Sequence, residues 1–234
     1  MSTNSLKKVS IAAGVAGVMA QTADTALGQG VDELIAGIKD SSDKVRTEAW
    51  QSAGEVGAPA VKPLAKVMTD NDLEVARAAK RALWQIVRYT GRPKANKERR
   101  AVETELTELL GKDQPVAVQR EVLWMLSEIG ARNSIKPIVR LLRNEELRED
   151  ARMALERIPG KRAVTTLKAG FEKAPEDFKP NIAQSLRKRG EEVDGYPCQK
   201  LVPTKKTDVK ALEALCGSLK SKGFGDGRAH PGLN

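Results

Sequence analysis

The stretch that decides the fold runs from Asp40 to Thr69 and reads DSSDKVRTEAWQSAGEVGAPAVKPLAKVMT. It contains a polar lead-in, an amphipathic segment that ends at Gly57, a break with Pro59, and a second amphipathic segment that begins near Ala60. This order predicts a helical hairpin of about thirty residues, in which neither helix is long enough to bury its apolar face alone. The hairpin must therefore stack against further structure.

The chain supplies copies of this hairpin. The apolar ladder of the first helix has spacings of 4, 4 and 3 and consists of Val45, Ala49, Ala53 and Val56. Shifts of 30, 73 and 102 residues give three more ladders: Val75, Ala79, Leu83, Ile86; Val118, Val122, Leu126, Ile129; and Leu147, Ala151, Leu155, Ile158. A shift of 133 gives Phe178, Ile182, Leu186 and then Arg189, so the fifth copy loses its last apolar residue. The array is therefore expected to end near this copy.

The second helices repeat as well. A shift of 74 aligns Lys62, Pro63 and Lys66 with Lys136, Pro137 and Arg140. We expect both prolines in a first helical turn, where the missing N–H removes no helical hydrogen bond. Gly57 and Gly130 are expected to close the preceding helices in a left-handed conformation. RAVTTLKAGF at 162–171 is a weaker third instance, and VDELIAGIK at 31–39 is expected to be an unpaired second helix that opens the array.

The recurring order is an Asp, a few polar residues, an Ala-rich helix, a Gly, a short turn and Ala-Val-x-Pro-Leu. It resembles the short HEAT repeats of phycobilisome-lyase-type proteins, over about Val31 to Glu192. The resemblance implies an all-α fold, an α-solenoid of about four to five HEAT-like hairpins in residues 31–192. Because this repeat serves many unrelated tasks, the resemblance implies the fold far more strongly than a function such as chromophore lyase.

Composition agrees with a solenoid. The 234 residues are 40% hydrophobic but only 3% aromatic, so the core must consist mainly of Ala, Val, Leu and Ile. Small side chains allow helices to stack closely, and each repeat needs only its neighbours.

The first residues have the composition of a secretory signal peptide. Lys7 and Lys8 precede VSIAAGVAGVMA, a short run of apolar and small residues, and candidate cleavage sites follow Ala20, Ala23 and Gly28. We therefore predict a signal peptide in residues 1–28 and a periplasmic or secreted protein. The alternative is an apolar N-terminal helix that packs on the first repeat of a cytoplasmic protein.

The repeats are predicted to stop at Glu192, and residues 193–234 form a third region. An irregular connection leads to TDVKALEALCGSLKSKG at 207–223, whose apolar stripe predicts a helix that caps the end of the array. The residues after it are expected to be a flexible tail. Cys198 and Cys216 are a candidate disulfide if the chain is exported, and two unpaired thiols otherwise.

An insertion distinguishes the second repeat. RYTGRPKANKERR at residues 88–100 lengthens the spacing to the third repeat from 30 to 43 residues. We predict an exposed loop between a helix that ends near Val87 and one that begins near Lys97. Six of the thirteen residues are basic, namely Arg88, Arg92, Lys94, Lys97, Arg99 and Arg100. Such a loop on a rigid scaffold is a candidate binding element, and the alternative is an ordinary solvated charge run.

The charge distribution favours anionic partners. The net charge is +9, with +4 in residues 71–112 and +5 in residues 178–234. The resemblance implies that second helices line a concave face, from which Lys62, Lys66, Lys136 and Arg140 would project. Glu103, Glu105 and Glu108 interrupt this basic stripe. A face of mixed sign suits a protein partner better than a continuous phosphate track.

The sequence contains no recognisable catalytic constellation. The only His is His230 in the C-terminal tail, so a catalytic triad or a His-containing metal cluster in the repeats is excluded. No phosphate-binding loop of the G-x-x-x-x-G-K-[ST] type occurs. We expect no catalytic residue, no metal and no cofactor, and we expect Trp50, Trp84 and Trp124 to serve helix packing.

These observations predict a monomeric, non-enzymatic scaffold. The first hypothesis is an exported protein that binds a protein partner, or an anionic polymer or lipid surface, through the concave face and the loop at 88–100. The second is a cytoplasmic protein that binds nucleic acid through the same basic residues. HEAT-like DNA glycosylases would be the extreme case, although no motif specific to them is present.

Overall fold

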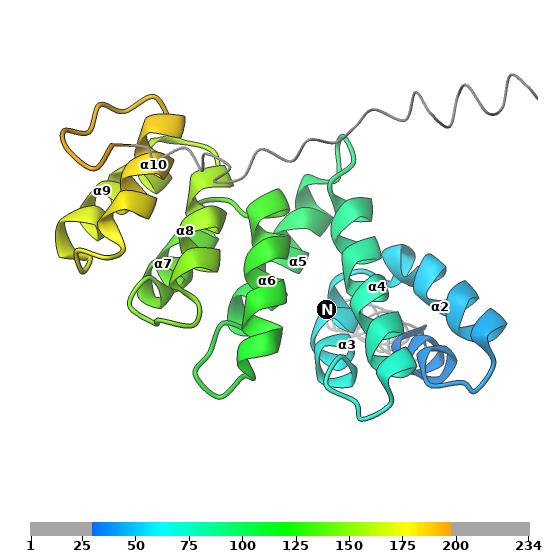
Figure 1. The fold of residues 1–234 in the computed structure, drawn as a ribbon. Helices are drawn as coiled ribbons and strands as arrows, with labels where there is room; N and C mark the ends of the chain where they lie inside the picture. Colours follow the sequence, from blue (N-terminus) through cyan, green and yellow to red (C-terminus); the bar gives the residue numbers. More distant parts are fainter. Residues whose placement is uncertain (1–29, 198–234) are drawn as a thin grey trace, which may run out of the picture. The chain divides into compact units, whose positions relative to one another are not determined.

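The computed structural model describes residues 30–197, which belong to one compact unit that ends at Pro197. The predicted signal peptide, the predicted capping helix, Cys198, Cys216 and His230 lie outside the described residues. Residues 30–197 fold into helices and contain no strand. The helices cover residues 30–38, α2 (Asp43–Val56), η1 (Ala58–Ala60), α3 (Val61–Val67), α4 (Leu73–Thr90), α5 (Asn96–Glu108), α6 (Val116–Ile129), α7 (Arg132–Leu141), α8 (Arg148–Arg157), α9 (Lys161–Lys173) and α10 (Lys179–Lys188) (Figure 1). The predicted all-α solenoid is confirmed.

The helices form two layers. Helices α2, α4, α6, α8 and α10 pack in succession and are called the first-helix layer below. Helices α3, α5, α7 and α9 pack in succession as well and are called the second-helix layer. Figure 1 shows the hairpins stacked one after another along the chain. The helix at residues 30–38 has no preceding partner in the described part of the chain, as expected for a second helix that opens the array.

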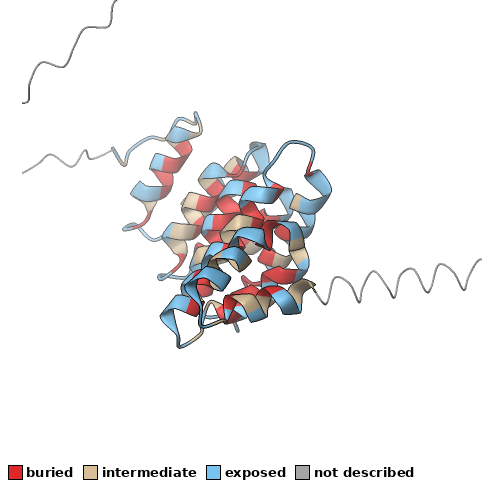
Figure 2. Cartoon of the chain, turned by 90° about the vertical axis from the view of Figure 1, so that its right-hand side faces the viewer, coloured by how far each residue is buried: buried red, intermediate tan, exposed pale blue. Residues whose placement is uncertain are grey.

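The core lies between the two layers (Figure 2). Every residue of the second, third and fourth ladders is buried, and so are the three apolar residues of the fifth. The first ladder differs, because Ala53 is fully buried but Val45 is 38% exposed. Helix α2 is the first member of its layer in the described residues and packs against α4 on one side only. The sequence pattern located the ladder correctly but could not indicate that part of its first copy is exposed to solvent.

The fifth copy is better adapted than the sequence suggested. Arg189, which takes the place of an apolar residue, donates to the carbonyl oxygens of Glu156 at 2.7 Å, of Ile158 at 2.6 Å and of Gly160 at 3.2 Å. These carbonyls belong to the last turn of α8 and the turn that follows it, where helical partners are missing. Arg189, directly after α10, thus joins the fifth copy to the C-terminal end of α8.

Two expectations about turn residues were wrong. Gly57 has φ 71°, as expected, but Gly130 has φ −61° and needs no left-handed conformation. A Cβ at Gly130 would lie 2.3 Å from the carbonyl oxygen of Leu126, so a close backbone approach explains this glycine. Pro63 is the third residue of α3, but Pro137 lies in the second turn of α7, because α7 begins at Arg132. The equivalent residues before α3 form the short helix η1 instead.

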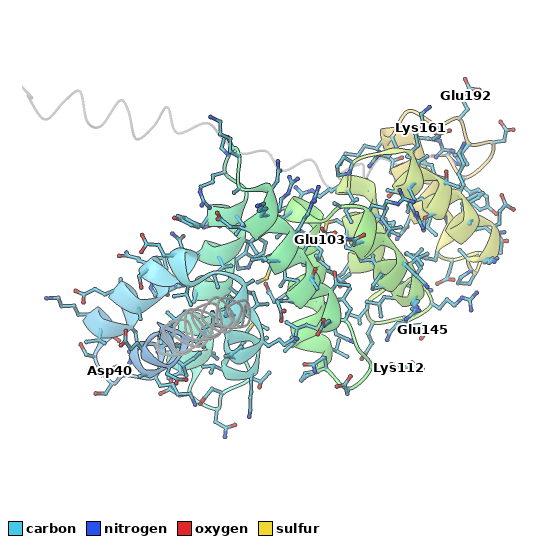
Figure 3. All side chains as sticks on the ribbon, turned by 180° about the vertical axis from the view of Figure 1, so that it is seen from behind. Asp40, Glu103, Lys112, Glu145, Lys161 and Glu192 are labelled. Carbon is cyan, nitrogen blue, oxygen red and sulfur yellow. The ribbon has the colours of Figure 1, made fainter. Side chains whose placement is uncertain are left out.

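Glu103 also departs from the prediction. It was expected on the surface beside Glu105 and Glu108, but it is only 2% exposed and lies in the middle of the stack (Figure 3). Its Oε1 accepts hydrogen bonds from the backbone N–H of Ala131 at 2.9 Å, the N–H of Ser134 at 3.2 Å and the Ser134 hydroxyl at 2.7 Å. A carboxylate from α5 therefore caps the N-terminus of α7, where free N–H groups and the helix dipole favour negative charge.

Candidate binding surfaces

Four basic residues of the second-helix layer occupy matching positions. Lys62 and Lys66 lie on α3, and Lys136 and Arg140 lie on α7, and all four are exposed. Their spacing of four residues places each pair on one face of its helix. The sequence therefore identified a genuine set of surface cations, although α5 lies between the two pairs.

Helix α5 neutralises one of these cations. The Lys62 Nζ lies 2.6 Å from Glu108 and 3.0 Å from Glu105. The hydrogen bond with Glu108, followed by that with Glu105, raises the pKa of Lys62. Within residues 30–197, Lys66, Lys136 and Arg140 form no ion pair. The predicted interruption of the basic stripe is thus correct for Glu105 and Glu108, and it leaves three cations available.

Two grooves flank α3. One has a volume of about 560 Å³ and lies between the helix at 30–38 and α3, with apolar walls from Val31, Ile35, Pro63 and Val67. The other has a volume of about 420 Å³ and lies between α3 and the α5–α6 region, with apolar walls from Ala65, Leu109, Pro115 and Val118. Lys66 and Thr69 border both grooves. Sequence reasoning missed the grooves, because they depend on how neighbouring helices pack.

The first groove carries an ion pair at its border. Lys39 lies 3.4 Å from Asp70. The backbone N–H of Asp72 and, after it, Lys39 lower the pKa of Asp70. Each groove therefore combines apolar walls with charged groups of both signs, which is the chemistry of a surface that contacts protein side chains.

The basic insertion at 88–100 is mostly helical: α5 begins close to Lys97, as predicted, but α4 runs past Val87, so the connection is shorter than expected. Helix α4 continues to Thr90 and α5 begins at Asn96, so only residues 91–95 connect them. Arg, Lys and Glu favour helix, and the tertiary packing of α4 and α5 extends both helices into the insertion. This α4–α5 turn rises above the ends of the neighbouring helices (Figure 1).

Two of the basic residues at the α4–α5 turn interact with aromatic or acidic neighbours. The Arg92 guanidinium lies 3.9 Å from the centre of the Tyr89 ring and 2.6 Å from Glu98. Arg88 lies 5.8 Å from the centre of the Trp84 ring. Such contacts are stabilising, because a cation is attracted to the negative face of an aromatic ring.

The remaining basic residues of the turn are less constrained. Arg99 donates to the side chain of Asn96 at 3.2 Å and is half-buried. Lys94, Lys97 and Arg100 are exposed and form no ion pair with the part of the chain that the structure describes. The structure thus divides the six predicted residues into a stacked or bonded group and an unpaired group of three.

No group of three His, Cys, Asp or Glu side chains in residues 30–197 is arranged to hold a metal ion. None of the described helices combines the length and the apolar composition that crossing a membrane requires.

Comparison with known proteins identifies the repeats. Residues 103–187 match the family model described as HEAT repeats, a stretch from α5 to α10. No curated protein matches the sequence. Among solved structures, the chain is similar to a designed armadillo repeat protein in complex with peptide (KR)4, with 22% identity, 66% of this chain and 80% of that chain covered, and a TM-score of 0.39. It is also similar to computationally designed armadillo repeat proteins for modular peptide recognition, with 22% identity, the same coverages and a TM-score of 0.41. Residues 103–187 are thus matched to HEAT repeats, and the ladders copied at 45–56 and 75–86 show that the same helical spacing begins before that stretch.

Proposed function

We propose that this HEAT-repeat protein is a non-enzymatic scaffold that binds a protein partner through its second-helix layer. The observation that carries the proposal is the pair of grooves beside α3, which share Lys66 and Thr69 and have apolar walls. Side chains of a bound polypeptide would enter the two grooves, and Lys66 between them would contact an acidic group. Lys136 and Arg140 on α7 would extend the contact along the layer.

Site-specific photo-crosslinking in the native cell tests this surface. A photoreactive amino acid at Thr69, which is exposed and borders both grooves, should capture a discrete protein partner that mass spectrometry identifies. The same amino acid at Gln184, exposed on α10 in the first-helix layer, is the matched control. Capture of the same proteins at both positions, or of none at Thr69, would contradict the proposal.

A second candidate function is binding of nucleic acid through the α4–α5 turn. It is favoured by Lys94, Lys97 and Arg100, which are exposed and carry no ion pair in the described part of the chain. Three phosphate contacts would give an affinity that falls with salt concentration, with a slope of roughly −2 to −3 in a plot of log K against log salt. Neutralising the three residues should then flatten the slope, whereas Lys66→Gln should leave it unchanged.

Export remains part of the proposal and rests on the composition of residues 1–28. N-terminal sequencing of the protein from its native cell should find a chain that begins after Ala20, Ala23 or Gly28. A chain that retains Met1 and fractionates with the cytoplasm would exclude export. It would favour the second candidate function, binding of nucleic acid.

A further inference from the structure

Three successive members of the first-helix layer carry the same pair of side chains. In each, a basic residue precedes a tryptophan by four positions: Arg46 and Trp50 on α2, Lys80 and Trp84 on α4, and Arg120 and Trp124 on α6. Residues four apart lie on the same face of a helix, so each pair offers a cation and an indole N–H side by side.

In two of the three cases the pair forms hydrogen bonds with a carboxylate on the next helix of the first-helix layer. Glu121 on α6 accepts from Lys80 and, at 3.3 Å, from the Trp84 Nε1. Asp150 on α8 accepts from the Arg120 Nε at 3.0 Å and from the Trp124 Nε1 at 3.1 Å. Both acids occupy the same repeat position, three residues after the first ladder residue of their helix. The arrangement is therefore a repeated device that joins neighbouring first helices.

The first interface lacks its acid. The corresponding position on α4, three residues after Val75, is Ala78. The Trp50 Nε1 is buried and has no hydrogen-bond partner in the described residues. A buried donor without a partner is unusual and unfavourable, because it has lost its hydrogen bond to water.

A pocket occupies the place of the missing side chain. Its volume is about 280 Å³, and it is lined by Asp43, Arg46, Thr47, Trp50, Glu74, Ala78 and Arg81. The Arg81 guanidinium lies 6.0 Å from the centre of the Trp50 ring, is exposed, and forms no ion pair within residues 30–197. The two acids of the pocket are already engaged, Asp43 with Arg46 and Glu74 with Arg77.

We propose that this Ala78 pocket binds the carboxylate of an Asp or Glu side chain from a partner polypeptide. The carboxylate would take the place that Glu121 and Asp150 hold in the next two interfaces, accepting from the Trp50 Nε1 and from Arg81. A phosphate suits the pocket less well, because Asp43 and Glu74 would repel its second negative charge. The site lies on the first-helix layer and is independent of the grooves beside α3.

Nuclear magnetic resonance of the full chain tests the site directly. The ¹⁵N–¹H signals of the three indoles are assigned by Trp→Phe variants, and the acetylated, amidated peptide Gly-Gly-Glu-Gly-Gly is the probe. We expect saturable shifts of the Trp50 signal with a Kd on the order of millimolar, as befits one charged contact. The Trp84 and Trp124 signals should stay in place, and the peptide with Gln instead of Glu should have no effect.

Variants make the test specific. Ala78→Glu supplies the acid within the chain, so it should move the Trp50 signal before any peptide is added and abolish the response. Glu121→Ala should open the equivalent pocket, so that the probe then shifts the Trp84 signal as well. Arg81→Gln, an exposed change that spares the fold, should weaken binding at least about fivefold, the loss of a modest charged hydrogen bond. Lys44→Gln, on α2 outside the pocket, should not weaken it.

Several results would overturn the proposal. An unmoved Trp50 signal at saturating peptide, or an undiminished response in Ala78→Glu, would exclude the pocket. An equal shift with inorganic phosphate would refute the preference for a carboxylate. None of these results affects crosslinking at Thr69, so failure of this site and failure of the proposed function are distinguishable.

Discussion

At the scale of single residues, the side chains that decide local structure are those whose partners lie far away in the sequence. Glu103 holds the first turn of α7 from a different hairpin, 28 and 31 residues before the groups that donate to it. In the sequence it looks like one of three surface glutamates of a helix. The packing of α5 against α7 buries Glu103 but leaves Glu105 and Glu108 accessible, and no local sequence pattern encodes that packing.

Glu103→Ala should therefore destabilise the fold strongly. It leaves the buried N–H of Ser134 without its acceptor, while the N–H of Ala131 keeps the Ser134 Oγ at 3.0 Å, and the loss should cost about 2–3 kcal/mol. Glu105→Ala, on the same helix, removes only a part-exposed contact with Lys62 and should cost less than about 1 kcal/mol. Urea unfolding followed by circular dichroism measures both, and equal losses would contradict the capping role.

The two glycines provide a second contrast at this scale. Gly130→Ala places a Cβ 2.3 Å from a backbone oxygen that a rotamer change cannot move. Gly57→Ala meets no atom within 4 Å but must adopt φ 71° with ψ −140°, a region that residues other than Gly rarely enter, which costs on the order of 1–3 kcal/mol. We expect a larger drop in the free energy of unfolding for Gly130→Ala, about 3 kcal/mol, because the helix end has to shift. The reverse order would show that the end of α6 relaxes freely.

At the scale of helices, polar side chains join the last members of the first-helix layer. Glu156 on α8 accepts from Lys188 at 2.6 Å and from Ser185 at 2.7 Å on α10, and it pairs with Arg152 at 2.8 Å. Burial alone would raise the pKa of Glu156, but the bonds from Lys188 and Ser185 and the charge of Arg152 outweigh it and lower the pKa. The carboxylate is thus more favourable in the folded chain than in the unfolded one.

Stability should accordingly fall in acid. A carboxyl group with a lowered pKa stabilises the fold above its unfolded pKa, about 4.3 for Glu, and this contribution is lost as the pH falls through the folded pKa. We expect the free energy of unfolding to be level at neutral pH and to decline below about pH 4.5. Glu156→Gln should lower stability at pH 7 and reduce the decline, and an unchanged pH profile would contradict this role.

Helix boundaries mark where prediction from sequence succeeded and failed at this scale. The ladders placed α2, α4, α6, α8 and α10 correctly, because each ladder repeats the spacing that a buried helical face requires. The start of α5 near Lys97 was predicted correctly, but α4 was expected to end near Val87, because Tyr89, Gly91 and Pro93 suggested turns, and it continues to Thr90. The competing tendency of Arg, Lys and Glu to extend α4 and α5 left only five residues outside them.

At the scale of the whole described array, position decides how much a repeated residue matters. Val45 and Val118 hold the same ladder position, but Val45 is 38% exposed and Val118 is 1% exposed. The copies look alike in sequence, so the pattern predicted the fold of the array without ranking its members. The candidate surfaces were predictable only as sets of cations, since the grooves and the Ala78 pocket arise between helices.

Substituting each valine by alanine should show this difference as unequal losses of stability. Val118→Ala removes fully buried methyl groups and should cost about 2 kcal/mol. Val45→Ala removes half-exposed ones and should cost less than about 0.5 kcal/mol. Thermal unfolding of both variants measures the difference, and similar melting temperatures would mean that Val45 is covered in the intact chain.

The succession of interfaces has a mechanical consequence. Packing joins each helix to its neighbours along the layers, so a load applied at the two ends of residues 30–197 passes through every interface in series. Small rotations at each interface add up over the array, which makes it compliant in bending while each hairpin stays intact. A partner that binds two distant hairpins would therefore have to supply the elastic energy of bending the array. Most of the bending would occur at the weakest interface between hairpins.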